Sequence, residues 1–523
     1  MTARALRACI PTATGFAAQL LLALVSGALG VLAFAPFYFW PVALVSLIVL
    51  FSLWHQSPSI RRAFAIGFAW GLGAFTAGVS WIYVSLHVYG SMPLILAGLA
   101  TVLFCAYLSL YPALAGALYR ALQLRFRVQP GVALRVLMPV CFVIFEYLRG
   151  WIVSGFPFLS IGYSQTPGGV IGAPLAGYAA IIGVYGISLL LALSAALLLW
   201  WMDAQANAVS TTKRMATFIS ILGIWGIGAL LLQVSWSEPA GNVLRVALLQ
   251  GNIEQSMKWR EDQRAPTLAI YQQMISGSDA KLIVLPETAL PDFLDRIAPE
   301  YLEPLRQHAV KQGADILAGV PIAERPAGAS QYHLANSAVS IGTSPTQRYD
   351  KQHLVAFGEF VPPLFSWVYR WLQIPMSDFN TRETESRPMS LAAHKIAVNI
   401  CYEDAFGSEI ASQLPEAELL VNMSNMAWFG HSLASDQHAQ MSQMRALETS
   451  RWMLRATNTG VTAAINEKGE IVKSLPQFAR GALEFDVQPR TGMTPFVRWK
   501  DGVILGLLAL GLAGSCVGRL SKH

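Results

Sequence analysis

Charged residues are scarce in this sequence of 523 residues, of which only 13% are Asp, Glu, Lys or Arg and 54% are hydrophobic. A soluble domain normally carries about 25% charged residues. The deficit is uneven, because charges are sparse before residue 240 and ordinary from there to 495. This asymmetry excludes a wholly soluble protein and indicates a polytopic membrane protein with one inserted soluble domain.

Cysteine is scarce as well, with five residues in the whole chain. Four of them lie in or beside long apolar stretches: Cys9, Cys105, Cys141 and Cys516. Cys401 is the only cysteine in the polar segment, which excludes a disulfide within that segment and leaves either an inert core thiol or a nucleophile. No group of His and Cys residues has the spacing of a metal site.

Long apolar stretches fill most of the first 235 residues, and one more lies at the end of the chain. Each can supply the ~20 residues that a helix needs to cross the hydrocarbon, although the second is short. We therefore expect about eight transmembrane helices, at 16–35, 38–55, 63–86, 91–118, 131–152, 169–200, 215–235 and 501–518.

Basic residues alternate between the loops that join these stretches. The loops after the first, third and fifth stretches carry no Lys or Arg. The others and the two chain ends carry Arg4, Arg7, Arg61, Arg62, Arg120, Arg125, Arg127, Lys213, Arg214, Arg519 and Lys522. By the positive-inside rule, both termini are expected in the cytoplasm and the polar segment in a periplasm-like compartment. The rule also accounts for much of the net charge of +6, which therefore does not indicate a nucleic-acid partner.

These observations predict three parts of the chain. We expect a membrane domain at 1–238 with seven transmembrane helices, a soluble domain at 239–495, and a last transmembrane helix with a cytoplasmic tail at 496–523. Within the soluble domain, short β-type runs alternate with helical stretches, which favours an α/β domain with buried sheets. The expected helices are 266–276, 301–312 and 437–456, and the expected strands are 243–249, 281–285, 316–320, 335–341, 395–400, 419–423, 461–465 and 470–473.

Three polar residues lie where such strands end. Cys401 follows the strand 395–400, Glu287 follows the strand 281–285, and Lys351 stands between them in the sequence. A cysteine attacks acyl carbon well only as the thiolate, so it needs a base or a positive charge nearby. Glu287 can accept the thiol proton, and Lys351 can hold an oxyanion and favour the thiolate.

Two further groups fit the same chemistry. The backbone N–H of Tyr402 is a natural second donor to an oxyanion, and Glu359 could fix the Lys351 ammonium or relay a proton. Each residue also has an ordinary interpretation: Cys401 as a core thiol, Glu287 as a helix cap and Lys351 as a solvated surface residue. The residues by themselves leave both interpretations open.

The three positions resemble the Glu–Lys–Cys triad of the nitrilase, or carbon–nitrogen hydrolase, superfamily, whose fold is an α-β-β-α sandwich. The whole chain resembles one membrane branch of it, the apolipoprotein N-acyltransferases. The runs that carry this resemblance are Ala33–Phe37 with Trp40-Pro41, Trp81, Glu146–Gly150, Gly155–Phe158, Gln250–Ile253 with Lys258-Trp259, Phe357–Pro362 and Cys401–Glu403. One departure is that Ala356 replaces a proline usual in the family, so the loop loses a restraint on φ.

The resemblance implies a bacterial inner-membrane enzyme with a periplasmic nitrilase-like domain. Glu287, Lys351 and Cys401 would move an acyl chain from the sn-1 position of a phospholipid, typically phosphatidylethanolamine, to a thioester on Cys401. The chain would then pass to the α-amino group of a diacylated apolipoprotein. It implies no metal or other cofactor and no nucleic acid, and we expect a monomer.

Four residues are implied in supporting roles: Glu359, Tyr402, Glu403 and Trp259. Trp259 and Tyr402 could instead be core aromatics, and Glu403 a helix-entry acid. Aromatic residues at 363–371 and 423–429 are expected to dip into the membrane interface and guide acyl chains. Two other functions stay open: a membrane-anchored amidase or nitrilase acting on a small amide, and a transporter-like bundle with a degenerate binding domain.

Overall fold

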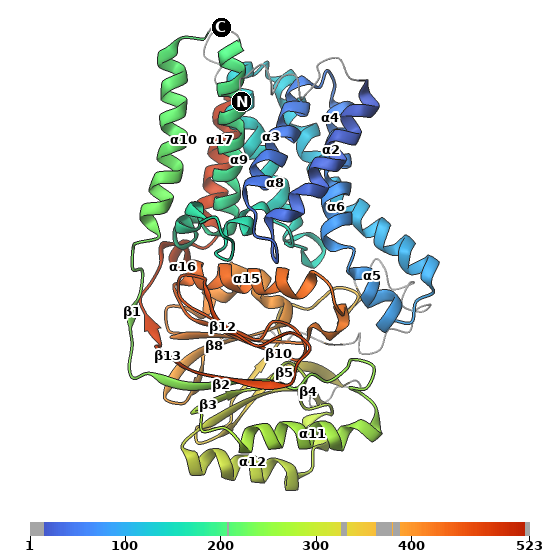
Figure 1. Cartoon of the computed structure of the whole chain (residues 1–523), viewed down its shortest axis with the longest axis vertical. Coiled ribbons are helices and arrows are strands. Elements are labelled where there is room, and N and C mark those ends of the chain that lie inside the picture. Colours follow the sequence, from blue (N-terminus) through green and yellow to red (C-terminus); the bar gives the residue numbers. More distant parts are fainter. Residues whose placement is uncertain (1–14, 207–208, 326–331, 362–378, 380–386, 518–523) are drawn as a thin grey trace. The chain divides into compact units, whose positions relative to one another are not determined.

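A computed structural model describes residues 15–206, 209–325, 332–361, 379 and 387–517 (Figure 1). The chain forms two compact units. One comprises the described parts of 1–83, 94–234 and 499–523, and the other comprises 84–93 together with 235–498. The sequence did not predict that the short segment 84–93 belongs with the polar residues.

The first unit is a bundle of helices (Figure 1). Among the residues that the structure describes, six helical segments are long and apolar enough to cross a membrane: Phe16–Ala33, Ile60–Val79, Leu94–Arg125, Pro130–Arg149, Pro174–Asp203 and Thr211–Leu231. The apolar helices Pro41–Gln56 and Gly502–Cys516 are shorter. The predicted membrane bundle is thus confirmed, whereas the count of eight spans stays a prediction.

Glycines allow these helices to pack closely. A Cβ atom on Gly27 of α2 (Phe16–Gly30) would overlap the carbonyl of Trp70 in α4 (Ile60–Val79). A Cβ atom on Gly73 of α4 would overlap the carbonyl of Leu24 in α2. Small residues at helix crossings are typical of membrane bundles, where close backbone approach replaces the hydrophobic effect.

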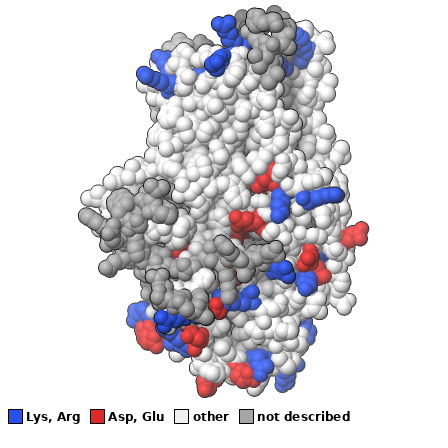
Figure 2. All heavy atoms as spheres, turned by 180° about the vertical axis from the view of Figure 1, so that it is seen from behind, with Lys and Arg blue, Asp and Glu red and all other residues white. Residues whose placement is uncertain are grey.

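The surface of this unit is suited to lipid. On the face in Figure 2, a broad band of the bundle carries no Lys, Arg, Asp or Glu, and basic side chains gather at one end. Large apolar side chains are exposed on its helices, among them Leu21, Leu29, Ile95, Leu99, Leu103, Leu222, Leu230 and Leu510. An exposed apolar surface of this extent is unfavourable in water and favourable in a bilayer.

In its described residues, the second unit contains two six-stranded sheets. One has the order β13-β2-β3-β4-β5-β6, from Gly481–Val487, Leu244–Gln250, Leu282–Val284, Asp315–Glu324, His333–Gly342 and Arg348–Asp350. The other has the order β12-β11-β10-β9-β8-β7, from Ile471–Ser474, Ala463–Ile465, Met453–Thr457, Leu419–Ser424, His394–Ile400 and Met389–Leu391. A separate pair joins β1 (Glu238–Pro239) to β14 (Arg490–Thr491).

The two sheets face each other across a shared apolar core. That core includes Leu248, Val284 and Leu317 from the first sheet and Val398, Val421 and Leu454 from the second. Helices α11 (Glu261–Ser276) and α12 (Pro299–Gln312) cover the outer face of the first sheet, and α15 (Ala434–Thr449) covers the second (Figure 1). The predicted α-β-β-α sandwich is confirmed.

Burial on both faces explains why the central strands read as continuous apolar runs. It also explains one wrong prediction, the helix at 437–456. The helix α15 ends at Thr449, Ser450 has a φ of 52°, and β10 begins at Met453. Residues 453–457 are all buried between strands β9 and β11, and this tertiary environment overrides the local helical pattern. The first predicted helix also begins earlier, at Glu261, so that Pro266 lies inside it.

Candidate active site

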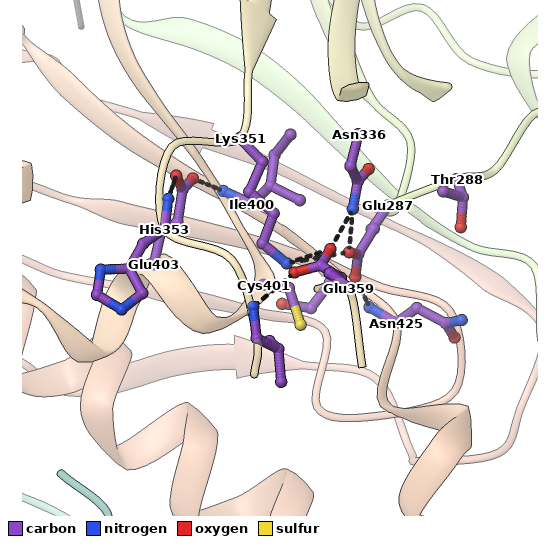
Figure 3. Close-up of polar contacts among 12 residues, drawn as sticks. Glu287, Thr288, Asn336, Lys351, His353, Glu359, Ile400, Cys401, Glu403 and Asn425 are labelled. Carbon is purple, nitrogen blue, oxygen red and sulfur yellow. Dashed lines mark hydrogen bonds and ion pairs between the residues drawn. The ribbon is translucent and has the colours of Figure 1, made fainter. Parts of the chain in front are cut away.

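Cys401 lies directly after β8, at the start of a short 3₁₀ helix, Cys401–Ala405 (Figure 3). Its φ is 53°, in the left-handed region that few residues other than glycine adopt. Such strain costs on the order of 1–3 kcal/mol and persists only where neighbouring contacts hold the backbone. The sharp turn points the Cys401 side chain away from the strand and toward Glu287 and Glu359 (Figure 3).

Glu287 follows β3 and is buried, with 7% of its surface exposed. Its Oε1 accepts a hydrogen bond from Asn336 Nδ2 at 2.7 Å, and its Oε2 accepts one from the backbone N–H of Asn425 at 2.8 Å. These two donors hold the carboxylate in one orientation. Burial and a fixed orientation suit a general base, because a base has to lie within hydrogen-bond distance of the proton that it removes.

Lys351 follows β6 and lies between two carboxylates. Its Nζ is 2.9 Å from Glu359 Oε1 and 3.6 Å from Glu287 Oε1, and only 1% of its side chain is exposed. Burial by itself would lower the pKa of this ammonium, but Glu359, Glu287 and Cys401 together outweigh burial and raise it. Lys351 therefore stays charged, which is the state that an oxyanion needs.

Glu359 reaches this site from the loop after β6. Its Oε1 contacts Lys351 and accepts a second hydrogen bond from Asn336 Nδ2 at 3.0 Å, and its Oε2 accepts one from the backbone N–H of Val355 at 2.9 Å. Of the two roles expected for Glu359, these contacts fit the fixing of the ammonium.

Burial raises the pKa of the Cys401 thiol, and the negative charge of Glu287 raises it further. Lys351 lowers the pKa, as the sequence predicts, but does not outweigh burial. The resting cysteine is therefore a protonated thiol, so the thiolate that the reaction needs has to form with the help of a base. Attack by this sulfur would require the thiol to lose its proton, and Glu287 is a buried carboxylate whose charge acts on Cys401.

This raised pKa predicts the pH dependence of Cys401 alkylation. Iodoacetamide reacts with the thiolate, so the rate at Cys401 should keep rising about tenfold per pH unit up to pH ~9. A free thiol of pKa about 8.5 in the same tube should begin to level off there. The measurement is peptide mass spectrometry of the Cys401 adduct against pH, and a plateau below pH ~8 would contradict a thiol that is protonated at rest.

Glu403 joins the segment that carries Lys351 to the segment that carries Cys401. Its carboxylate accepts hydrogen bonds from the backbone N–H of Ile400 at 2.6 Å, from that of Gln352 at 2.6 Å and from Tyr349 Oη at 2.9 Å. Burial raises the pKa of Glu403 to about 7, against the backbone donors, which lower it. The hydrogen bond from Ile400 is also a helix-entry contact, so both interpretations of Glu403 describe the same carboxylate.

The two supporting aromatics differ in exposure. Trp259 is 41% exposed, which excludes the core interpretation, and Lys258 Nζ lies 5.9 Å from its ring centroid. Tyr402 is buried, and its ring packs edge-on against Phe406 at 5.3 Å. The side chain of Tyr402 thus fits a core aromatic, while its backbone belongs to the turn that carries Cys401.

Models of known protein families match both the helical and the α/β part of this chain. The family model for the N-terminal domain of apolipoprotein N-acyltransferases matches residues 26–197, and the carbon–nitrogen hydrolase model matches residues 245–495. The apolipoprotein N-acyltransferase of Nitrosomonas europaea is 44% identical over 506 residues, covering 96% of this chain and 98% of that protein. The chain belongs to the apolipoprotein N-acyltransferase family. That of Methylococcus capsulatus is 43% identical over 513 residues, covering 96% of this chain and 97% of that protein.

Membership in this family confirms the resemblance and makes the protein a multi-pass membrane acyltransferase. Among solved structures, the C. elegans NitFhit protein is similar at 16% identity and a TM-score of 0.37, covering 48% of this chain and 61% of that one. A likeness of that size adds nothing to the assignment.

The contacts of several polar groups in the site could not be predicted, because no spacing in the sequence marks them. Lys258 is buried, and its Nζ donates to the Glu287 carbonyl at 3.2 Å and to Thr288 Oγ1. Burial lowers the pKa of Lys258 to about 8. Asn336 and Asn425 donate to the Glu287 carboxylate. In the part of the chain that the structure describes, no three His, Cys, Asp or Glu side chains are grouped to hold a metal ion.

Proposed function

We propose that the protein transfers an acyl chain from the sn-1 position of a phospholipid, through a thioester on Cys401, to the α-amino group of the N-terminal S-diacylglyceryl-cysteine of apolipoproteins. The observation that carries this proposal is the grouping of buried Glu287, buried Lys351 and half-buried Glu359 around the half-buried Cys401 (Figure 3). The name of the relatives, apolipoprotein N-acyltransferase, supports the lipoprotein acceptor.

In the first half-reaction, the Cys401 sulfur bonds to the ester carbonyl carbon while Glu287 takes the thiol proton. The carbonyl oxygen becomes an oxyanion, which the Lys351 ammonium and the backbone N–H of Tyr402 stabilise. The C–O bond to the glycerol then breaks. The leaving alkoxide takes the proton from Glu287 and departs as lysophospholipid, and the acyl chain stays on Cys401 as a thioester.

In the second half-reaction, the neutral α-amine of the acceptor attacks the thioester carbon. Glu287 accepts a proton from the nitrogen, and the same donors hold the second oxyanion. The C–S bond breaks, the sulfur takes the proton back from Glu287, and an amide and the free thiol result. Two substrates that share one nucleophile in this way give ping-pong kinetics.

The supporting residues act through the triad. Glu359 fixes the Lys351 ammonium, and Glu403 holds the two segments that carry Lys351 and Cys401. In this proposal Trp259 contacts substrate, and the exposure of its ring supports that role. The preferred donor is phosphatidylethanolamine, and the enzyme acts as a monomer.

Aromatic residues near the site keep water from the thioester in this proposal. Trp428 is half-buried and contacts Tyr89 edge-on at 6.3 Å, within the same unit, whereas Met426 is buried. The other expected aromatics, Phe365, Trp367, Tyr369 and Trp371, lie outside the described residues. A transferase has to hold its thioester until the second lipid-borne substrate arrives, and a dry site serves this need.

Acylation without an acceptor tests the proposed function. Enzyme mixed with phospholipid alone is expected to accumulate a stable thioester, because water is excluded and no amine is present. Intact-mass spectrometry should show one added acyl chain that neutral hydroxylamine removes, and a diacylated lipopeptide should discharge it at the steady-state rate.

The control is Cys401→Ala, which should gain no acyl chain. If the thioester decays to free fatty acid as fast as lipopeptide discharges it, the protein is a hydrolase, and the amidase-like function replaces the transferase.

We also propose a location for each part of the chain. Residues 1–238 form the membrane domain in the bacterial inner membrane, residues 239–495 form the catalytic domain on the periplasmic side, and residues 496–523 form a last span with a cytoplasmic tail. Both termini are cytoplasmic. Support comes from the alternation of basic loops.

Reporter fusions test this topology. Alkaline phosphatase fused after residue 344 should be active, because this enzyme becomes active only in the periplasm. Green fluorescent protein fused at the same position should be dark, because it does not become fluorescent there. Fusions after residue 58, in the loop before Arg61 and Arg62, should give the opposite pair of results. Fluorescence at 344 would overturn the proposed location.

A further inference from the structure

The carbonyl oxygen of Cys401 accepts two hydrogen bonds from the protein interior. Asn422 Nδ2 donates to it at 3.0 Å, and His438 Nε2 lies 3.1 Å from it. Asn422 is in β9, and His438 is in α15. Both side chains are buried, and neither faces the triad carboxylates through a direct hydrogen bond among the described contacts. Two donors on one carbonyl restrain the strained backbone of the nucleophile.

The contacts of Arg455 in β10 show that Asn422 and His438 are both donors to the Cys401 carbonyl. Its Nη1 lies 2.8 Å from Asn422 Oδ1, and its Nη2 lies 2.8 Å from His438 Nδ1. A guanidinium has only donors, so the atoms that it faces must be acceptors. The amide nitrogen of Asn422 and the Nε2–H of His438 are therefore the groups left to point at the Cys401 carbonyl.

Other contacts agree with this assignment. Ser424 Oγ also donates to Asn422 Oδ1, at 2.6 Å, and Asn422 Nδ2 also donates to Asn399 Oδ1, at 2.6 Å. Because His438 Nδ1 faces the Arg455 donor, the ring carries its one N–H on Nε2. Burial, which lowers the pKa of His438 against Asp404, favours this neutral form. The same N–H is shared between two acceptors, Asp404 Oδ1 at 2.5 Å from Nε2 and the Cys401 carbonyl at 3.1 Å.

The partners of the Arg455 guanidinium are protein side chains. It is fully buried, and its Nη1 lies 2.9 Å from Asp404 Oδ2 and 2.9 Å from Ser442 Oγ. Asp404 belongs to the same 3₁₀ helix as Cys401. The guanidinium charge is thus paired with the Asp404 carboxylate in the same 3₁₀ helix as Cys401.

The planar peptide between Cys401 and Tyr402 couples the direction of the Cys401 carbonyl to the direction of the Tyr402 N–H. The bond between Cys401 and Tyr402 is not among the cis peptides of the described residues. In a trans peptide the C=O and the N–H point in opposite directions. Since the Cys401 carbonyl is held toward Asn422 and His438, the Tyr402 N–H points the other way, where the oxyanion forms in the proposed function.

We infer that Arg455, Asn422 and His438 are positioning residues of the oxyanion hole. They do not touch substrate. Arg455 orients the other two, these two hold the Cys401 carbonyl, and the peptide plane thereby aims the Tyr402 N–H. This inference rests on the proposed function, because it concerns the oxyanion of that reaction.

Two reactions of Cys401 separate this role from general support of the fold. Acylation by phospholipid passes through an oxyanion, whereas alkylation by iodoacetamide displaces iodide at a saturated carbon and forms none. For Asn422→Leu and His438→Leu, single-turnover acylation is expected to fall by about 10²–10³-fold, as for the loss of an oxyanion donor. Alkylation of Cys401 at the same pH is expected to stay near the wild-type rate.

Two further variants complete the experiment. Asn422→Asp keeps the shape of the side chain but turns an acceptor toward the Cys401 carbonyl, so it should give the same selective loss. Gln413→Leu is the matched control, because Gln413 is equally buried and donates to the carbonyl of Val398 in β8, away from the nucleophile. It should acylate normally.

The outcomes are distinct. Equal loss of acylation and alkylation in the Asn422 and His438 variants would show a displaced thiol and overturn the inference, as would undiminished acylation. Failure of the wild-type enzyme to form any acyl adduct would overturn the proposed function and this inference with it.

Discussion

Cys401→Ala is expected to abolish both acylation of the enzyme and transfer to lipopeptide, because no other group can form the thioester. Cys401→Ser should be nearly as inactive, with a loss of about 10⁴-fold or more. Burial and Glu287 already raise the pKa of the thiol, and a serine hydroxyl in the same place is far harder to ionise. Acylation is measured by intact mass and transfer with a diacylated lipopeptide.

Cys105→Ala is the matched control for this experiment. Cys105 is a buried thiol of the helical unit, in α6 (Leu94–Arg125), and its replacement should leave transfer unchanged. If Cys401→Ser kept a large share of the wild-type rate, the thiol would not be the group that carries the acyl chain.

Lys351→Arg is expected to lose acylation by about 10³-fold, although the positive charge is kept. The ammonium contacts Glu359 at 2.9 Å and lies 3.6 Å from Glu287, with only 1% of the side chain exposed. A planar guanidinium cannot take this place as a single-point donor without displacing one of the carboxylates. Lys351→Met should be at least as inactive, because it leaves two buried carboxylates without their cation.

Lys395→Met is the control for Lys351. Lys395 is an exposed lysine of β8, and its Nζ donates to Ser390 Oγ. Its replacement should not change the acylation rate. Transfer at the wild-type rate by Lys351→Arg would remove Lys351 from the triad.

Prediction from the sequence succeeded where a pattern reports the local environment. The charge deficit predicted the helical bundle, and apolar runs closed by turn residues predicted most strands of the sandwich. It failed at 437–456, where the helix stops at Thr449 and the buried strand β10 follows. The choice between helix and strand there depends on neighbours β9 and β11, which the local pattern does not contain.

The sequence by itself determined the membrane character and the α/β class and, through the family motifs, singled out Glu287, Lys351 and Cys401 as the proposed catalytic residues. The tertiary structure alone decided what these groups meet. Lys351 contacts Glu359, and Glu287 accepts a hydrogen bond from Asn336. The Cys401 carbonyl lies within hydrogen-bond distance of Asn422 and His438, and Arg455 contacts both of these side chains. Most of these partners are far apart in the chain, so their contacts depend on how two sheets pair and pack. Sequence periodicity reports which face of an element is buried, but it carries no information on which distant side chain will lie opposite.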